Sequence, residues 1–384
     1  MKKHIKLLVI LGIILVGSFS FYLFKGYKKD ALVYENNKIM PSSSGIAMML
    51  ETSAGSGNYE MTTRSEWPTE GYVFNANLSK CENGSELSWD NENKKVLMSG
   101  NKSDKCYVYF DVYVKPTIAN TCSSGTNLAT CIKTFGDKGS SVSNIYHHDA
   151  SLTNGAEDNS YRFAGASDQV NNYVCFGSSE ASCPTDNLYR IIGVFGDKVK
   201  LIKSTSVGTK AWDSDDSNTW STSSLNTYLN NEFINAFDET TKGKIAETTW
   251  KVGGNTYNNI AKQPAKTAYQ NEINSSPSEN KKIGLMYASD YGFAAVPSAW
   301  TTNLCDYNGA AIKSANWMYL GAYEWTISRN AGYSNFAFIV NGTGYVAGGG
   351  NVTNAGGFRP VFSLSSFVNY ASGSGSATDP ILVN

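Results

Sequence analysis

Residues 188–204, LYRIIGVFGDKVKLIKS, contain two apolar runs separated by Gly196-Asp197. A glycine-containing pair between two such runs predicts a β-hairpin. The following residues 220–237, WSTSSLNTYLNNEFINAF, have apolar side chains at helical spacing, and Ser221 to Ser223 are candidates for the N-cap. The apolar positions on one stripe are Leu225, Tyr228, Leu229, Phe233 and Phe237. We therefore expect a hairpin followed by the main helix of a domain.

The C-terminal half continues with segments that we interpret mainly as strands. Residues 282–294, KIGLMYASDYGFA, and 316–329, NWMYLGAYEWTISR, are typical of buried strands, with Trp317 and Trp325 in the core. Residues 336–350 predict a hairpin that turns at Asn341-Gly342, and residues 357–368, GFRPVFSLSSFV, predict a closing strand. The domain would span residues 161–370, with a flexible tail at 371–384.

The N-terminal half contains a second β-rich region. Residues 59–115 alternate apolar and polar side chains between turn sequences and predict a small β module. Residues 30–58 would form a stalk or linker. Residues 116–160 are rich in Ser, Gly, Asn and Thr and would form a polar connector. Its tandem His147-His148 would point in different directions, which favours a solvated loop over a metal site.

Residues 1–29 resemble a membrane anchor. The apolar run 7–24 has 18 residues without a charge, and lysines flank both of its ends. A helix of this length covers about 27 Å, which is enough to cross the hydrocarbon core of a bilayer. We expect an uncleaved transmembrane helix. A cleaved signal peptide is the alternative, although its apolar region is usually shorter.

Seven cysteines follow the apolar run. Their grouping along the chain suggests the pairs Cys81 with Cys106, Cys122 with Cys131 and Cys175 with Cys183, and leaves Cys305 without a partner. Six cysteines alone allow about 15 connectivities. Such pairing requires an oxidising compartment and would place residues 30–384 outside the cell. Reduced, buried cysteines in a cytosolic protein are the alternative.

Charge and motif content argue against several functions. The chain has 32 Lys plus Arg, 33 Asp plus Glu and 3 His, for a net charge of -1. No basic block follows the first thirty residues, so we expect no nucleic-acid partner. The sequences G-x-S-x-G, H-E-x-x-H and G-x-x-x-x-G-K are absent, so no catalytic residue is predicted. The abundant carboxylates leave a glycosidase pair open.

Several segments resemble a known family. The order of LYRIIGVF, KLIKS, the helix at 220–237, EWTISR, NGTGYV and GFRPVFSLSS is similar to that of C-type-lectin-like domains of the formylglycine-generating-enzyme type. The resemblance is strongest to a branch found in surface proteins of gut Firmicutes. It implies a twisted antiparallel sheet whose long loops carry the activity. The calcium-lectin sequences EPN, QPD and WND are absent, and the C-terminal region has only Cys305, so neither calcium-dependent sugar binding nor sulfatase activation is implied.

The loops between Trp317 and Phe358 supply a candidate ligand-binding surface. Tyr provides large contact area at low entropic cost, and Asn provides adaptable hydrogen bonds, as in an antibody paratope. The candidate residues are Arg329, Asn330, Tyr333, Asn335, Tyr345, Asn351 and Asn354. Alternatively, the aromatic residues fill the core and the Asn and Gly residues form turns. The Asn residues before Gly357-Phe358-Arg359 would also fit a receptor diversified by a retroelement.

An acidic stretch supplies a candidate metal site. Asp213, Asp215, Asp216 and Asn218 present alternating oxygen ligands that could wrap a calcium ion. The stretch has no internal glycine and no bidentate Glu at the EF-hand distance, which favours a solvated acidic turn. Calcium is therefore a weak candidate, and we expect no other cofactor.

Together these features predict an α+β protein with an N-terminal transmembrane helix, a small all-β module and a C-terminal C-type-lectin-like domain. It would be a single-pass protein of the cell membrane with its C-terminal region extracellular. We expect an adhesin-like or receptor-like function, with an extracellular protein or glycan as the ligand. A surface hydrolase acting on glycans and a purely structural envelope protein are the alternatives.

Overall fold

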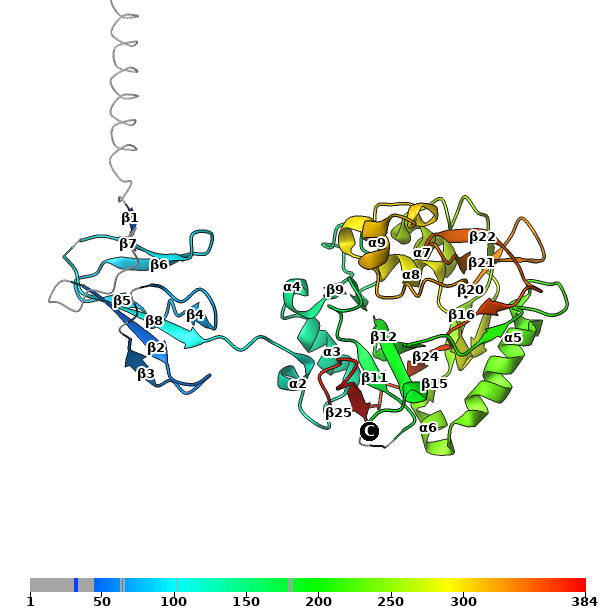
Figure 1. Ribbon diagram of the computed structural model, residues 1–384, viewed down its shortest axis with the longest axis horizontal. Coiled ribbons are helices and arrows are strands. Elements are labelled where there is room, and N and C mark those ends of the chain that lie inside the picture. The colour runs from blue at the N-terminus through cyan, green and yellow to red at the C-terminus, as the bar shows by residue number, and fades with distance from the viewer. Residues whose placement is uncertain are drawn as a thin grey trace, which may run out of the picture. The chain divides into compact units, whose positions relative to one another are not determined.

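The computed structural model describes residues 31–33, 45–62, 64, 66–101, 103–178, 180 and 182–384. The chain divides into two compact units, Met1–Lys115 (unit 1) and Pro116–Asn384 (unit 2) (Figure 1). Residues 7–24, for which the sequence predicts the membrane anchor, lie outside the described residues.

The fold class expected from the sequence is wrong. Among the residues that the structure describes, no helix has both the length and the apolar character needed to cross a membrane. The described chain consists of mixed sheets connected by short helices, none of which exceeds nine residues. Most apolar residues of the described chain are buried in two cores built around sheets, because they occur in short alternating or continuous runs.

Unit 1 is built from two small sheets. One has the order β1-β7-β6, and the other has the order β3-β2-β8-β4 with β5 also paired to β8. The strands are β1 Ala31–Val33, β2 Ile46–Glu51, β3 Tyr59–Met61, β4 Tyr72–Phe74, β5 Lys80–Cys81, β6 Glu86–Asp90, β7 Lys95–Ser99 and β8 Cys106–Val112. Residues 30–58, expected to be a linker, thus contribute strands to both sheets.

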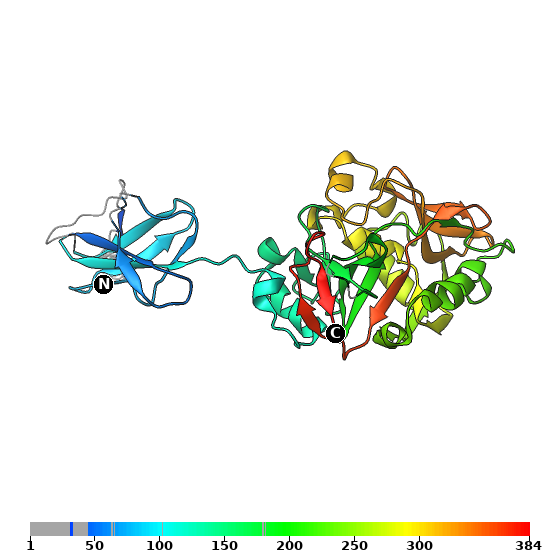
Figure 2. The ribbon, with the colours of Figure 1, turned by 60° about the horizontal axis from the view of Figure 1, so that its bottom comes forward.

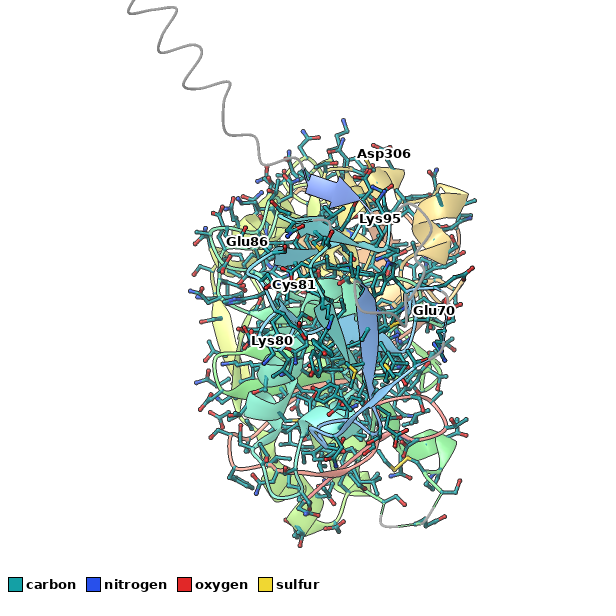
Figure 3. All side chains as sticks on the ribbon, turned by 90° about the vertical axis from the view of Figure 1, so that its left-hand side faces the viewer. Glu70, Lys80, Cys81, Glu86, Lys95 and Asp306 are labelled. Carbon is teal, nitrogen blue, oxygen red and sulfur yellow. A yellow bond between two sulfur atoms is a disulfide. The ribbon has the colours of Figure 1, made fainter. Side chains whose placement is uncertain are left out.

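Alternation along these strands separates the core of unit 1 from its surface. Val96 and Met98 on β7 are buried together with Ile46 and Met48 on β2 and with Trp67. Charged side chains such as Lys80 on β5 and Glu86 on β6 are exposed (Figure 3). A separate core of this kind makes unit 1 a folded module in its own right.

Unit 2 has a large sheet in the order β15-β24-β13-β12-β11-β26-β25, to which β9, β10 and β19 are added. The strands are β9 Ile145–His147, β10 Tyr161–Phe163, β11 Tyr173–Cys175, β12 Leu188–Phe195, β13 Lys198–Lys203, β15 Ile245–Ala246, β19 Ile283–Gly284, β24 Val361–Leu364, β25 Tyr370–Ser372 and β26 Ile381–Val383. β26 pairs with β11 and β25 pairs with β26, so the C-terminal segment adds strands to the sheet instead of forming a flexible tail (Figure 2).

The hairpin predicted from residues 188–204 lies at the centre of this sheet. Strands β12 and β13 are antiparallel, and Phe195 lies opposite Lys198. Gly196 has φ +64°, the left-handed conformation that a tight hairpin turn requires. Both strands are buried on almost all positions, which explains why their sequences are nearly continuous in apolar residues.

A second sheet of unit 2 has the order β14-β23-β20-β21-β22, with β17 paired to β20, and β16 and β18 form a separate pair. The strands are β14 Thr209–Lys210, β16 Thr248–Lys251, β17 Gly254–Asn255, β18 Ser278–Lys281, β20 Glu324–Asn330, β21 Phe336–Val340, β22 Val346–Asn351 and β23 Gly356–Gly357. Val340 pairs with Val346, so the hairpin predicted around Asn341-Gly342 is confirmed. Trp317 and Trp325 are buried, as expected.

The helices of unit 2 are short. They are α2 Ile118–Thr121, α3 Leu128–Gly136, α4 Ser140–Ser143, α5 Ser224–Thr227, α6 Glu239–Lys244, α7 Ala265–Ile273, α8 Ala288–Phe293 and α9 Ala310–Ser314. Short 3₁₀ turns occupy Thr185–Asn187, Trp220–Thr222, Pro297–Ala299 and Leu304–Asp306.

Other segments of unit 2 also differ from their predicted structure. Within residues 316–329, predicted as a strand, only 324–329 belong to β20. Residues 116–160 are not a connector, because α2, α3, α4 and β9 bury apolar side chains such as Leu128 and Ile132 in the core of unit 2. His148 is fully buried, whereas a solvated loop was expected. Within residues 282–294 only β19 is a strand, residues 285–287 have no regular structure, and α8 is helical. All six residues of α8 are buried, and periodicity cannot distinguish a helix buried on every side from a buried strand.

The three expected disulfides are confirmed. Cys81 pairs with Cys106, Cys122 with Cys131, and Cys175 with Cys183, while Cys305 is free. The first bridge joins facing residues of β5 and β8, and the second joins α3 to the residue that follows α2. Three disulfides indicate an extracellular location for the protein.

Candidate functional site

A helical segment borders a row of hollows on the surface of unit 2. It consists of α5, a π-helical turn at Tyr228–Phe233, a 3₁₀ turn at Ile234–Ala236 and α6, which follow one another as a nearly continuous coil (Figures 1 and 2). Ser223 caps α5, because its side chain accepts a hydrogen bond from the Asn226 N–H. Leu225 and Leu229 are buried beneath the segment.

The π-helical turn changes which side chains of the helical segment border the hollow surface. In a π turn the residues are wound more widely than in an α-helix, so the side chains after it are rotated relative to those before it. Tyr228 at the start of the turn, Phe233 at its end and Phe237 four residues later are all only partly buried and pack against the same core. The helical segment thereby presents three aromatic rings along one edge.

Three adjoining hollows follow this edge, and we call them together the helical groove. The central hollow, of about 470 Å³, shares Tyr228 with an outer hollow of about 530 Å³ and shares Gly177 with a smaller hollow of about 280 Å³. The central hollow is lined by Gly177, Asp186, Asn187, Tyr189, Lys203, Thr205, Ser206, Val207, Tyr228, Phe233, Ala236 and Phe237. Its size is typical of a site for a small ligand.

The aromatic wall of the central hollow is held by ring contacts. Tyr228 meets Phe358 edge-on with centroids 5.8 Å apart, and Phe233 meets Phe237 edge-on at 5.6 Å. The ammonium of Lys210 lies 4.1 Å from the centroid of the Tyr228 ring. These contacts fix the ring orientations, so the wall needs little reorganisation to accept a ligand.

Lys203 lines the same hollow from the end of β13. Its ammonium donates to the carbonyl oxygens of Thr185 at 3.0 Å and Leu188 at 3.5 Å. Burial lowers the pKa of this ammonium, and the nearby carboxylate of Asp186 acts in the opposite direction. The hollow therefore combines a buried cation, an exposed carboxylate and aromatic rings.

The outer hollow is more acidic. Its lining includes Asp213, Asp215 and Glu232, with Lys210 as the one cationic residue in it. Hydroxyl groups of Thr222, Ser224 and Thr227 complete its polar surface. Carboxylates and hydroxyls of this kind can accept and donate hydrogen bonds to a polyhydroxylated ligand.

The structure buries some residues of the ligand-binding surface predicted from the sequence and leaves others accessible to solvent. Asn330 is buried, with its amide donating to the Gly348 carbonyl at 2.7 Å. Arg329 is half-buried and donates to the carbonyl of Val252 and the side-chain oxygen of Asn218. These two side chains therefore connect segments of unit 2 and are not presented to a ligand.

The other predicted members are more accessible. Tyr333 is 61% exposed and packs against Phe336, and Asn354 is exposed. Asn335 is half-buried, and its amide donates to the Asp216 carboxylate at 3.3 Å. Tyr345 is half-buried, and the side chain of Asn351 accepts hydrogen bonds within its own turn from Thr353. The alternative explanation, in which Asn residues form turns, thus holds for Asn351. For the exposed residues the binding role stays a prediction.

The four predicted calcium ligands do not form a metal site. Both carboxylate oxygens of Asp213 accept backbone hydrogen bonds, from Ser217 and Ser224. The Asn218 oxygen accepts from Arg329, and its amide nitrogen donates to three backbone carbonyls. Across the described part of the chain, no group of three or more His, Cys, Asp or Glu residues is arranged to hold a metal ion. The oxygens are used to build the loop instead.

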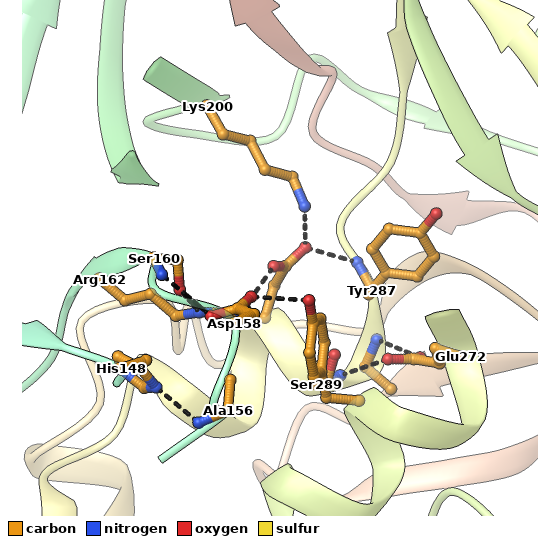
Figure 4. A network of polar contacts seen from close by, with 12 residues as sticks. His148, Ala156, Asp158, Ser160, Arg162, Lys200, Glu272, Tyr287 and Ser289 are labelled. Carbon is orange, nitrogen blue, oxygen red and sulfur yellow. Dashed lines mark hydrogen bonds and ion pairs between the residues drawn. The ribbon is translucent and has the colours of Figure 1, made fainter. Parts of the chain in front are cut away.

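Unit 2 also contains a buried polar network (Figure 4). Lys200 forms an ion pair with Asp290 at 2.5 Å, and Arg162 forms one with Asp158 at 2.6 Å. Tyr269 donates its hydroxyl proton to the same Asp158 carboxylate at 2.6 Å. The Asp290 carboxylate also accepts the Tyr287 N–H, which caps α8.

Glu272 extends this network on α7. Its carboxylate accepts hydrogen bonds from the N–H groups of Ala288 and Ser289 and from the Ser328 hydroxyl, and burial raises its pKa to about 7. His148, also buried, accepts the Ala156 N–H at its Nδ1 (Figure 4). Because these residues are inside the protein, we assign the network to the positioning of α8 and not to ligand binding.

A further ion pair explains the GFRP sequence. The buried guanidinium of Arg359 contacts the buried carboxylate of Glu324 at 2.5 and 2.9 Å. Arg359 also donates to the Met318 carbonyl at 2.8 Å. Two of the sequences that contribute to the family resemblance, EWTISR and GFRP, therefore meet in the core and have a structural role.

The comparisons with known proteins add one match. Residues 196–366 match a family described as a domain of unknown function, DUF6273. No curated protein and no solved structure matches the chain. None of these comparisons points to a C-type-lectin-like domain or to an activity. The matched segment contains β13, the helical segment and the second sheet, and thus most of the helical groove.

Sequence reasoning missed the helical groove. It identified Tyr228, Phe233 and Phe237 as the apolar stripe of a helix, and a stripe at helical spacing normally indicates core packing. Their partial exposure depends on the π-helical turn and on distant residues such as Asn187 and Ser206. The feature of the sequence that could have indicated a binding surface is the presence of these three aromatic residues among small polar ones.

Proposed function

We propose that this protein is an extracellular binding protein that holds a glycan in the helical groove of unit 2. The observation that carries the proposal is the central hollow, where Tyr228, Phe233 and Phe237 lie beside amide, hydroxyl and charged groups. Aromatic rings can pack on the apolar face of a sugar ring while polar groups bond its hydroxyls. The disulfides support the extracellular location.

The length of the groove also supports an oligomeric ligand. The central hollow could hold one or two sugar units, and the two hollows that adjoin it extend the surface in both directions. The outer hollow offers carboxylates and hydroxyls, which suit a ligand rich in hydroxyl groups.

The test is a screen of the full chain on an array of neutral and uronic-acid oligosaccharides, followed by calorimetric titration of the best probe. Tyr228→Ala should weaken binding about tenfold, because it removes a central aromatic contact. Thr205→Trp should also weaken binding, since an exposed residue lining the hollow would then fill it without loss of core packing.

Tyr333→Ala is the matched control, because this exposed tyrosine lies outside the groove. Binding that depends on Tyr333 and not on Tyr228 or Thr205 would contradict the groove and favour the predicted loop surface. If no oligosaccharide on the array binds, the proposed glycan-binding function is wrong. Cleavage of the probes during incubation would favour a hydrolase.

A further inference from the structure

The inference concerns the ligand class and rests on the function proposed above. It starts from Lys203, the last residue of β13, which is 4% exposed and lines the central hollow. Lys200, three residues earlier on the same strand, is also buried and pairs with the Asp290 carboxylate. Lys203 differs, because no described carboxylate forms an ion pair with it, and its hydrogen-bond partners are backbone carbonyls.

The ammonium of Lys203 retains a donor for a ligand. An ammonium has three N–H groups, and the carbonyl oxygens of Thr185 and Leu188 account for two of them. The Lys203 nitrogen also lies 5.3 Å from the centroid of Tyr189, another residue of the hollow's lining. Because Lys203 belongs to the lining of the hollow, we expect its third N–H to be the donor for a ligand group that enters there.

The charge of Lys203 is incompletely neutralised. A buried cation without an ion-pair partner is unfavourable, and an incoming anion would relieve that cost. Asp186 lies at the hollow and acts on Lys203 through space, but it is exposed and forms no ion pair with it. Screening by water weakens such a long-range interaction.

The aromatic wall of the central hollow indicates which chemical group the rest of the ligand contains. Tyr228, Phe233 and Phe237 provide ring faces and edges, as a pyranose requires, and the hollow has room for one or two such rings. We propose that the central hollow recognises a saccharide that bears a carboxylate, as in a uronic acid, with the carboxylate bound by Lys203. The charge-assisted hydrogen bond would select this sugar over its neutral counterpart.

The experiment compares trigalacturonate with its methyl ester, which has the same sugar rings but no charge. Calorimetric titration of the full chain should give about tenfold or tighter binding of the acid. In Lys203→Met, which keeps the length and loses the charge, this preference should fall to about one. Asp186→Asn should increase the preference, because it removes a competing carboxylate at the hollow.

The outcomes separate the inference from the proposed function. If both probes bind equally well and Tyr228→Ala weakens both, the glycan groove stands and the carboxylate assignment is wrong. If neither probe nor any array glycan binds, the proposed function fails. A tripeptide with a free C-terminal carboxylate is the third probe, and tighter binding of it than of trigalacturonate would overturn the saccharide class. Unchanged melting temperatures in the variants would exclude misfolding as the cause.

Discussion

At the scale of single residues, two buried titratable groups have opposite effects on how the stability of the fold depends on pH. Burial raises the pKa of Glu272 to about 7 and, with Arg162 nearby, lowers the pKa of His148 to about 2. A carboxyl group with a raised folded pKa stabilises the fold below the unfolded value of 4.5, and this stability is lost as the pH rises towards 7. A histidine kept neutral has the opposite effect, since stability is lost as the pH falls below 6.5.

Between pH 4.5 and 6.5 the two effects should therefore cancel. Glu272→Gln removes one of them, so relative to wild type the free energy of unfolding should rise with pH by about 1.4 kcal/mol per pH unit across this window. Urea unfolding at several pH values measures the difference. His148→Phe should show the reverse slope and serves as the partner variant. Parallel pH profiles of wild type and Glu272→Gln would show that Glu272 does not titrate there.

At the scale of elements, the helical segment depends on its N-cap. Ser223 is fully buried, and its side chain accepts the Asn226 N–H at the start of α5. Ser223→Ala should reduce the free energy of unfolding by about 1 kcal/mol, since one N–H of the first turn loses its acceptor. Thermal unfolding measures the change. Ser221→Ala is the matched control, because Ser221 is exposed and does not cap α5. Equal effects of the two substitutions would contradict the assignment of the cap.

Contacts between elements also explain why α8 is a helix although the sequence predicts a strand there. Residues 288–293 are helical because Asp290 and Glu272 accept the N–H groups at the start of the helix, and Glu272 comes from another element. The apolar sequence fits a buried strand equally well. The Glu272 carboxylate, which the tertiary structure brings to the start of α8, favours the helix over the strand.

At the scale of the whole molecule, the two units have separate cores. The hydrophobic cluster of unit 1 shares no residue with that of unit 2, and the Cys81–Cys106 bridge lies entirely in unit 1. Replacement of both cysteines by Ser should destabilise unit 1 by about 3 kcal/mol, because the bridge closes a loop in the unfolded chain. Calorimetry should show a lower melting temperature for one transition while the other stays unchanged. A single transition that shifts as a whole would contradict independent folding of the units.

Features that depend on neighbours along the chain could be predicted from the amino-acid sequence. The hairpin at 188–204 follows from Gly196-Asp197, the cap of α5 lies within Ser221 to Ser223, and the disulfides join cysteines that are close in sequence. Local spacing and turn chemistry suffice for such features, because they involve few residues and short loops.

The tertiary structure decided which side chains face a ligand. The sequence predicts Asn330 on a ligand-binding surface and Asn218 in a calcium site, yet both side chains are buried and donate hydrogen bonds to distant carbonyls. The central hollow brings Asn187, Lys203 and Phe233 together from segments separated along the chain. Exposure and juxtaposition of this kind depend on the packing of the whole chain, so no local pattern of residues could specify them.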